Sequence, residues 1–149
     1  MADQAKVRAE FIEKVGLIAQ GENLPRIAGR VLGLLIFDGQ AVSFGSLADE
    51  LQVSRGSIST STRTLIDRGL IKRVTKPGER QDYFQLGERP YATMMRNARL
   101  SFDRSKAEVE ATVAQLSDGA ARDRVRAYAE FYSALSDLAQ DSAERLDRD

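Results

Sequence analysis

The stretch "LADELQVSRGSISTSTRTLIDRGLIKRV", residues 47–74, decides the fold. It begins with a short segment that is apolar on one face and ends in a tight turn before Ser54. Ser54 has the side chain of a helix N-cap, the residues after it are expected to be helical up to Arg68, and Gly69 closes that helix. The stretch therefore predicts two short helices joined by a tight turn.

The second of these helices has a surface of small polar groups and arginine. At 100° per residue, Ile58 and Leu65 form one narrow apolar stripe. Ser61 and Thr62 flank the stripe. On the opposite side of the helix lie Gly56, Thr60, Arg63 and Asp67, with Ser59 beside them. At the N-terminal edge stand Arg55 and Ser57. Because Ser and Thr are mediocre helix formers, their number here favours a surface that contacts a partner over one that is merely solvated.

This surface suits a nucleic acid. Small side chains allow close approach, hydroxyls can bond phosphates and base edges, and arginine can pair with guanine through two hydrogen bonds. The helix N-terminus adds free backbone N–H groups and a partial positive charge for a phosphate. An active-site loop or a flexible linker are the alternatives, but Ile58 and Leu65 would anchor the segment, which argues against a linker.

The composition argues against an enzyme. The chain contains no cysteine and no histidine, which excludes disulfides, thiol chemistry, a Ser-His-Asp triad and a zinc site within it. "GSIS" lacks the glycine pattern of a nucleophile elbow, and "KPGER" is not a phosphate-binding P-loop. We therefore expect no catalytic residues, no metal and no cofactor.

A basic hairpin follows the second helix. Leu70–Thr75 alternates like a strand, Lys76–Arg80 has the Pro and Gly of a turn, and Tyr83–Leu86 is the expected return strand. Residues 54–80 carry seven basic and two acidic side chains, whereas residues 101–149 carry seven basic and eleven acidic ones. A basic hairpin tip can reach the minor groove beside a helix in the major groove.

The residues before this stretch predict two helices and a short strand. The first helix covers residues 3–20 and the second, apolar on most sides, covers residues 24–39 and should run through the core. Gly29 and Gly33 share one of its faces and permit a close helix crossing, although they can equally be tolerated small residues. Val42 and Ser43 fit an edge strand, and Ser46 is expected to cap the short helix Ser46–Gln52.

Residues 91–149 predict two long helices separated by "SDG" at 117–119. Apolar residues recur in both at the three- and four-residue spacing of a coiled coil. Two such helices have more apolar surface than they can hide from each other, so we expect a subunit interface, with packing on the chain's own domain as the alternative. The expected dimerisation residues are Phe102, Val109, Leu116, Val125, Tyr128, Tyr132, Leu135 and Leu146.

With these motifs in view, the chain resembles the winged-helix transcription regulators of the MarR superfamily, and most closely the GbsR-type branch. "LPRIAGRVLGLLIFDG", the stretch 47–74 and "KPGERQDYF" carry the resemblance. It implies a recognition helix at Ser54–Arg68 and a wing at Leu70–Leu86, in a homodimer bound to a near-palindromic operator. By position, the DNA-binding residues would be Ser54, Arg55, Gly56, Ser57, Ser59, Thr60 and Arg63 on the helix, with Lys76 and Arg80 at the wing tip.

The resemblance also implies a division of the chain. Residues 1–22 form an N-terminal dimerisation helix, residues 23–90 a winged helix-turn-helix domain, and residues 91–149 a two-helix dimerisation region. The expected fold is mainly α with a small β-hairpin wing.

Some relatives in the branch respond to choline-like cations, which need an aromatic cage. Tyr128, Phe131 and Tyr132, with Phe102 and Tyr91 as candidates nearby, are the aromatic residues to consider, but packing explains them as well and no effector is identified.

The predicted function is that of a dimeric, sequence-specific regulator of transcription, acting as a repressor on double-stranded DNA. The alternative is a winged-helix protein-interaction module without DNA binding, whose exposed face would more often be apolar or acidic.

The first ten residues lack the apolar core of a signal peptide, and no apolar run is long enough to span a bilayer. We therefore expect a soluble, cytoplasmic protein without a membrane partner.

Overall fold

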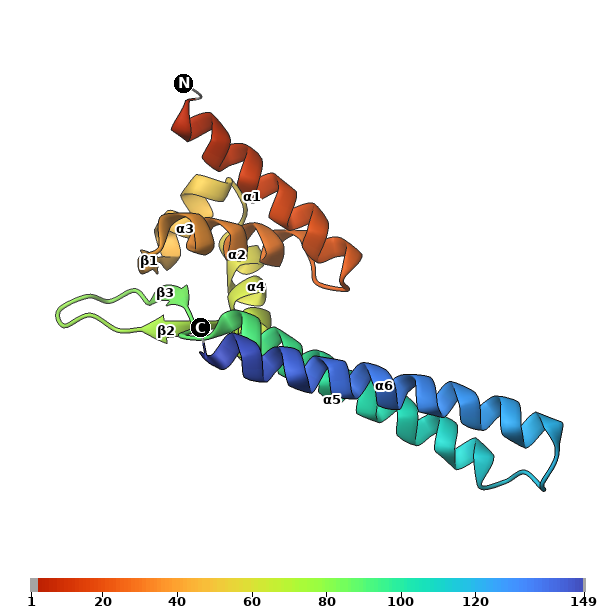
Figure 1. The fold of residues 1–149 in the computed structure, drawn as a ribbon. Helices are drawn as coiled ribbons and strands as arrows, with labels where there is room; N and C mark the ends of the chain where they lie inside the picture. The colour runs from red at the N-terminus through yellow and green to blue at the C-terminus, as the bar shows by residue number, and fades with distance from the viewer. Residues whose placement is uncertain (1–2, 149) are drawn as a thin grey trace. The chain divides into compact units, whose positions relative to one another are not determined.

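The computed structural model describes residues 3–148, which fall into two compact units divided after Pro90. Within these residues the chain forms six helices and three strands (Figure 1). The first unit contains α1 Gln4–Gly21, α2 Arg26–Asp38, β1 Val42–Ser43, α3 Phe44–Leu51, α4 Arg55–Asp67, β2 Ile71–Val74 and β3 Tyr83–Leu86. The second contains α5 Pro90–Val113, apart from its first residue, and α6 Ala120–Arg148. The predicted fold, mainly helical with a small β-hairpin wing, is confirmed.

Helices α1 and α2 cross too closely to leave room for a side chain at Gly29. A Cβ atom added at Gly29 would lie 2.5 Å from the Cβ of Ala19 and 2.9 Å from the Cα of Gly16. One added at Gly33 would lie 3.0 Å from the Cβ of Val15. The two glycines of α2 therefore serve the close crossing, which decides between the two explanations that the sequence allowed.

The core of the first unit is built around α2, as the sequence predicts. Val31 and Leu34 of this helix are fully buried. They share the core with fully buried side chains from each later part of the unit, namely Leu47 of α3, Ile58 and Leu65 of α4, and Phe84 of β3. α4 packs against α2, α3 and β2, so the outer face of α4 is held in a fixed orientation on this unit.

Helix α3 begins earlier than predicted. Ser43, not Ser46, is its N-cap, and the Ser43 side chain accepts a hydrogen bond from the Ser46 backbone N–H at 3.2 Å. Ser46 therefore lies inside the first turn, and its assignment as the cap was wrong. The reason is that Ser43 ends the short strand β1 with an extended backbone, which already presents its hydroxyl to the first turn.

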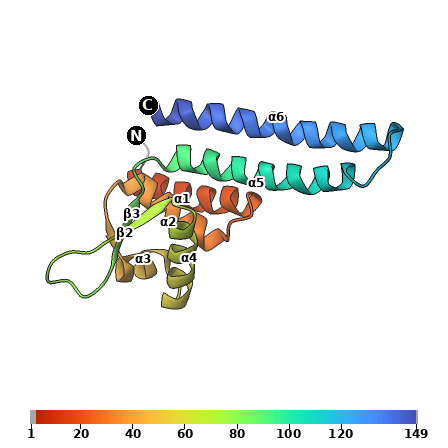
Figure 2. The same cartoon turned by 90° about the horizontal axis from the view of Figure 1, so that it is seen from below.

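The three strands form one antiparallel sheet in the order β1-β3-β2. β1 is an edge strand, as predicted, and pairs Val42 with Phe84. Between β2 and β3 the turn at residues 76–79 has Pro77 second and Gly78 third, with a φ of +81° at Gly78 and a hydrogen bond of 3.0 Å from the Glu79 N–H to the Lys76 carbonyl. These are the features of a type II turn. Figure 2 shows the loop extending well beyond the two strands.

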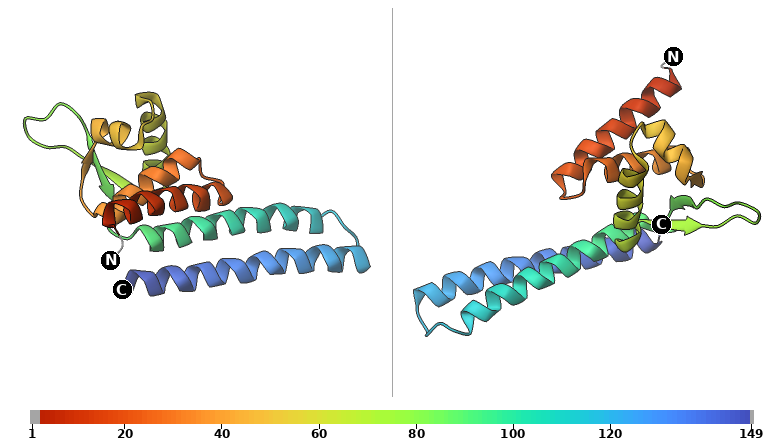
Figure 3. Two further views of the ribbon diagram at one scale, coloured as in Figure 1. Left: turned by 90° about the horizontal axis from the view of Figure 1, so that it is seen from above. Right: turned by 180° about the vertical axis from the view of Figure 1, so that it is seen from behind.

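The second unit is a pair of antiparallel helices (Figure 3). Polar contacts join α5 to the second half of α6. The Ser136 hydroxyl donates to Asp103 at 2.6 Å, and Arg96 pairs with Asp147 at 2.7 Å. The side chains that α6 buries are small: Ala129, Ser136, Ala139 and Ala143. Most of the predicted seam lies half-buried at the borders of this contact, and Tyr128 is 52% exposed.

The first long helix ends sooner than its heptad pattern predicts. α5 stops at Val113, where backbone N–H groups of Gln115 and Leu116 bond carbonyls three residues back. Leu116 therefore lies in the connection before α6 and does not continue a helical seam. The three-residue hydrogen bonds tighten the chain and end the helix before "SDG" is reached.

Candidate nucleic-acid interface

Helix α4 is anchored as predicted, but part of its hydroxyl content is structural. Ile58 and Leu65 are fully buried, and Ser61 and Thr62 are also buried, at 4% and 3% exposure. The Thr62 hydroxyl donates to the Ile58 carbonyl at 2.8 Å. Two of the six Ser and Thr residues between positions 57 and 64 thus belong to the packed side. The outward hydroxyls are fewer than the composition of the segment suggests.

The outward face of α4 carries the other predicted residues. Ser54, Arg55, Gly56, Thr60 and Arg63 are exposed, and Ser57 and Ser59 are partly so. Ser54 is the N-cap, as expected, because its side chain accepts from the Ser57 backbone N–H at 3.1 Å. Arg63 donates to the Ser59 hydroxyl at 3.1 Å, one turn away on the same helix. The helix therefore presents hydroxyls and two guanidinium groups outward.

Gly56 has no packing partner that requires a glycine. A Cβ atom there would meet only the Ser54 hydroxyl, at 3.8 Å, among the described residues. Glycine in a helix costs up to about 1 kcal/mol relative to alanine, and here no internal contact offsets that cost. The bare backbone at Gly56 is open toward whatever approaches the N-terminal turn of α4.

The wing places both predicted cations in solvent. Lys76 and Arg80 are exposed, and the Lys76 ammonium lies 4.2 Å from the centroid of the Tyr83 ring. Among residues 3–148 no hydrogen bond or ion pair holds Arg80. Arg73, in contrast, pairs with Asp82 at 3.3 Å across the base of the wing. Arg80 is thus the more available of the two predicted wing cations.

One contact that no sequence pattern indicated ties α3 to both α4 and the wing. The Arg55 guanidinium lies 4.6 Å from the centroid of the Phe44 ring. The Phe44 backbone N–H donates to the Asp82 carbonyl at 2.9 Å, and the Gly45 N–H donates to the Gln81 side chain at 3.0 Å. Phe44 was missed because the short helix was expected to begin two residues later.

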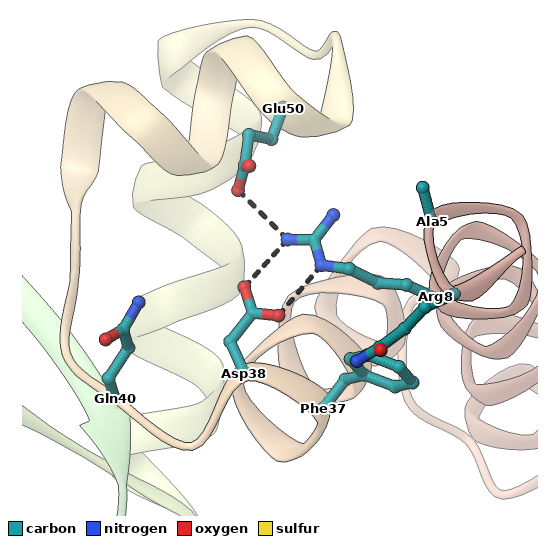
Figure 4. A pocket seen from close by; sticks show the side chains of 7 residues that line it. Ala5, Arg8, Phe37, Asp38, Gln40 and Glu50 are labelled. Atoms are coloured by element: carbon teal, nitrogen blue, oxygen red, sulfur yellow. Dashed lines mark hydrogen bonds and ion pairs between the residues drawn. The ribbon is translucent and has the colours of Figure 1, made fainter.

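A second polar cluster joins three helices away from this face. Arg8 of α1 makes two hydrogen bonds to Asp38 at the end of α2, at 2.8 and 2.7 Å, and a third to Glu50 of α3 at 3.2 Å (Figure 4). The hydrogen bonds with Asp38 raise the pKa of Arg8 above its ordinary value. The cluster lines a shallow pocket with Phe37 and Gln40. Because the Arg8 guanidinium bonds carboxylates from two other helices, its role is to fasten α1 to α2 and α3.

We expect Arg8→Ala to lower the free energy of unfolding by about 1–2 kcal/mol, because it leaves a largely buried carboxylate without its donors. Arg8 and Asp38 are only 26% and 20% exposed, so solvent screens the pair little. Urea unfolding measures the change. Lys6→Ala is the matched control on the same helix, since Lys6 is 75% exposed and 4.0 Å from Glu10. Equal losses in the two variants would contradict a fastening role for Arg8.

The aromatic residues of the second unit pack on one another. Tyr128 and Phe131 stack with an interplanar angle of 7°, and Tyr132 contacts both rings as well as Phe102. The hydroxyls of Tyr128 and Tyr132 are 2.9 Å apart, and this hydrogen bond raises the pKa of Tyr132. Among the described residues no ring contact joins Tyr91 to this group. The cluster has the contacts that packing requires.

The part of the chain that the structure describes contains neither a metal-binding cluster nor a membrane-spanning helix. No group of three or more Asp, Glu, His or Cys side chains within residues 3–148 could hold a metal ion. In the same part of the chain, no helix combines the length and the apolar character needed to cross a membrane.

Comparison with known proteins points to the same segment as the geometry. Residues 22–82 match the model of the MarR family. The HTH-type transcriptional regulator MmpR5 of Mycobacterium tuberculosis is 42% identical over 84 residues, which cover 56% of this chain and 51% of that protein. The HTH-type transcriptional repressor OpcR of Bacillus subtilis is 25% identical over 85 residues, covering 57% and 46%. The aligned part therefore spans only about half the length of these two relatives.

One solved structure extends the likeness to nearly the whole chain. The crystal structure of a transcriptional regulator has a TM-score of 0.79 and 28% identity, and the match covers 95% of this chain and 99% of that one. The matched family segment contains α2, α3, α4 and β2, together with the turn of the wing. Residues 22–82 of this chain therefore have a winged helix-turn-helix fold and are similar in sequence to the MarR family.

Proposed function

We propose that this protein is a dimeric, sequence-specific regulator of transcription that acts as a repressor in the cytoplasm. Helix α4 enters the major groove of double-stranded DNA, and the wing, Leu70–Leu86, reaches the neighbouring minor groove or backbone. The GbsR-type branch, suggested by the sequence runs quoted above, is part of the same proposal. So is a small-molecule effector, whose identity the proposal leaves open.

The observation that carries the proposal is the outward face of α4 within a matched MarR-family segment. Apart from Asp67 at the C-terminal end of the helix, its exposed groups are small, hydroxylic or cationic, and its N-terminal backbone is uncovered at Gly56. Residues 54–80 add seven basic side chains against two acidic ones. A face that docked another protein would need apolar side chains at its centre, and this one has none exposed.

Selection of bound duplexes from a random DNA pool tests the proposal most directly. We expect recovery of a near-palindromic site whose half-sites lie about one helical turn, 34–36 Å, or a multiple of it apart. Affinity for that site should fall steeply as salt rises, because each phosphate contact releases counterions. Equal affinity for the recovered site and for random DNA would contradict sequence-specific regulation. Absence of any duplex binding at low salt would favour the protein-interaction alternative.

Gly56→Ala should stabilise the fold and at the same time weaken DNA binding. We expect it to raise the free energy of unfolding by up to about 1 kcal/mol, because alanine is the better helix former. The same methyl group lies between the α4 backbone and the duplex, so binding to the selected site should weaken. Thermal unfolding and fluorescence anisotropy measure the two effects. Gly21→Ala, also in open space, is the control that should leave DNA binding unchanged.

The dimer is supported by apolar side chains that the second unit leaves uncovered. On α6, four exposed residues follow a spacing of four, three and four, as in a coiled coil: Ala127, Phe131, Ala134 and Leu138. Phe131 is 52% and Leu138 63% exposed. This stripe, Ala127 to Leu138, lies on the opposite side of α6 from the small residues that face α5. A second copy of the chain is the occupant that the proposal assigns to it.

Leu138→Glu should convert the dimer to a monomer, because it places a charge at the most exposed large apolar side chain of that stripe. Sedimentation equilibrium measures the molecular mass. Arg126→Glu also adds a glutamate on α6 but lies among its acidic residues, so it is expected to remain dimeric. A Leu138→Glu protein that stays dimeric at micromolar concentration would show that the stripe does not form the interface.

A further inference from the structure

Two aromatic rings and two arginines form a continuous array from α4 to the wing. The Arg55 guanidinium lies over the Phe44 ring, with 4.6 Å from its central carbon to the ring centroid. The Phe44 and Phe84 centroids are 6.4 Å apart at an angle of 50°. The Arg73 guanidinium lies 5.9 Å from the Phe84 centroid. Phe84 is fully buried, so the array is anchored in the core of the first unit.

Backbone hydrogen bonds hold Phe44 in register with the wing. Its N–H donates to the Asp82 carbonyl at 2.9 Å, one residue before β3, and the next N–H, of Gly45, donates to Gln81 at 3.0 Å. A Cβ atom at position 45 would lie 3.0 Å from that same Gln81 oxygen, so glycine leaves the approach open. The ring under Arg55 is thus attached to the base of the wing.

We propose that Phe44 is a positioning residue for DNA recognition, which holds Arg55 above its ring and sets the recognition helix and the wing at one mutual geometry. The role rests on the proposed function. An exposed arginine has many rotamers, and a duplex must select one of them. Arg55 has no carboxylate partner among the described residues, so the ring restrains the guanidinium without neutralising its charge. Its donors remain free for phosphate or guanine.

Phe44 also explains how α4 and the wing keep a fixed position relative to each other. α4 and the wing are joined in sequence only through Arg68–Leu70, while Phe44 joins them in space at the other end of α4. The half-buried Phe44 ring contacts both the exposed Arg55 and the buried Phe84, so the position of each depends on the ring. Loss of the ring should therefore reduce affinity through Arg55 even though Phe44 itself does not touch DNA.

A double-mutant cycle between Phe44 and Arg55 tests the role. Phe44→Leu in the full chain should weaken binding to the selected duplex about fivefold to tenfold, and Phe44→Tyr, which keeps the ring, should bind within about twofold of the wild type. In an Arg55→Ala background, Phe44→Leu should change affinity less than about twofold. If thermal unfolding shows that Phe44→Leu is not folded at the assay temperature, Phe44→Met replaces it.

A measurement without DNA completes the test. Protons above an aromatic ring are shielded, so the Arg55 Nε–H signal in a proton–nitrogen NMR spectrum should lie upfield in the wild type and in Phe44→Tyr, and move downfield in Phe44→Leu. An unmoved signal, or independent effects of the two substitutions on affinity, would overturn the positioning role while wild-type binding persists. A wild type that binds no duplex would instead overturn the proposed function, and the positioning role with it.

Discussion

Arg63→Ala is expected to weaken binding to the selected operator by about tenfold to a hundredfold and to relax the base preference at one position of each half-site. Arg63 is exposed at the middle of the outward face of α4, where a recognition helix lies deepest in the groove. An arginine that pairs with guanine through two hydrogen bonds contributes about 1–3 kcal/mol of discrimination. Its hydrogen bond to Ser59 directs the guanidinium along the helix before DNA is bound.

Arg80→Ala provides the matched comparison. Arg80 lies in the wing, where a contact with the backbone or the minor groove carries less base information. We expect this variant to weaken binding to all duplexes alike and to reduce the slope of log affinity against log salt by about one. Competition binding against a set of single-base operator variants measures both substitutions. A uniform loss for Arg63→Ala would show that Arg63 contacts only the backbone.

The largest expected effect on stability is that of Leu65→Ala, which should lower the free energy of unfolding by about 3–5 kcal/mol. The Leu65 side chain is fully buried, on the side of α4 that packs against α2, α3 and β2. Truncation removes the apolar contacts of three carbon atoms and leaves a cavity in the core. Since small domains are stable by only about 5–15 kcal/mol, a large part of the total would be lost.

Urea unfolding of Leu65→Ala with an unchanged m-value would identify the loss as one of native stability. Asp67→Ala, two residues further along the same helix and exposed, should change the free energy of unfolding by less than about 0.5 kcal/mol. A loss below about 1 kcal/mol for Leu65→Ala would mean that the surrounding side chains collapse into the space, and that α4 is held less rigidly than its burial indicates.

Local signals predicted most of the fold correctly. Ser54 caps α4 and Gly69 follows its end with a φ of +72°, because caps and left-handed closures depend on neighbours in sequence. The burial of Ile58 and Leu65 follows from a helical period that the sequence displays directly. The cap of α3 was misplaced because Ser43 and Ser46 are both suitable, and only the pairing of β1 with β3 decides between them.

The sequence predicted which residue types lie at the candidate site, but it did not predict which of them contact one another. The exposed positions of Arg55, Gly56 and Arg63 follow from helical geometry. The contact between Arg55 and Phe44 depends on a tertiary arrangement, since eleven positions and a turn separate the two residues, and no periodicity reports it. The exposed stripe around Leu138 was missed for another reason: the small residues of α6 proved to be the side that packs, so the larger apolar ones were left outside.

The tight crossing of α1 and α2 has a consequence for genetics. Every single-base change in a glycine codon that alters the amino acid introduces a bulkier residue or a stop, and at Gly29 even one methyl group would collide with Ala19. Such alleles would disturb the helix on which α4 rests without altering any residue proposed to meet DNA. In a screen for mutants that lose the proposed repression, codon 29 should therefore recur among loss-of-function alleles alongside the codons of α4.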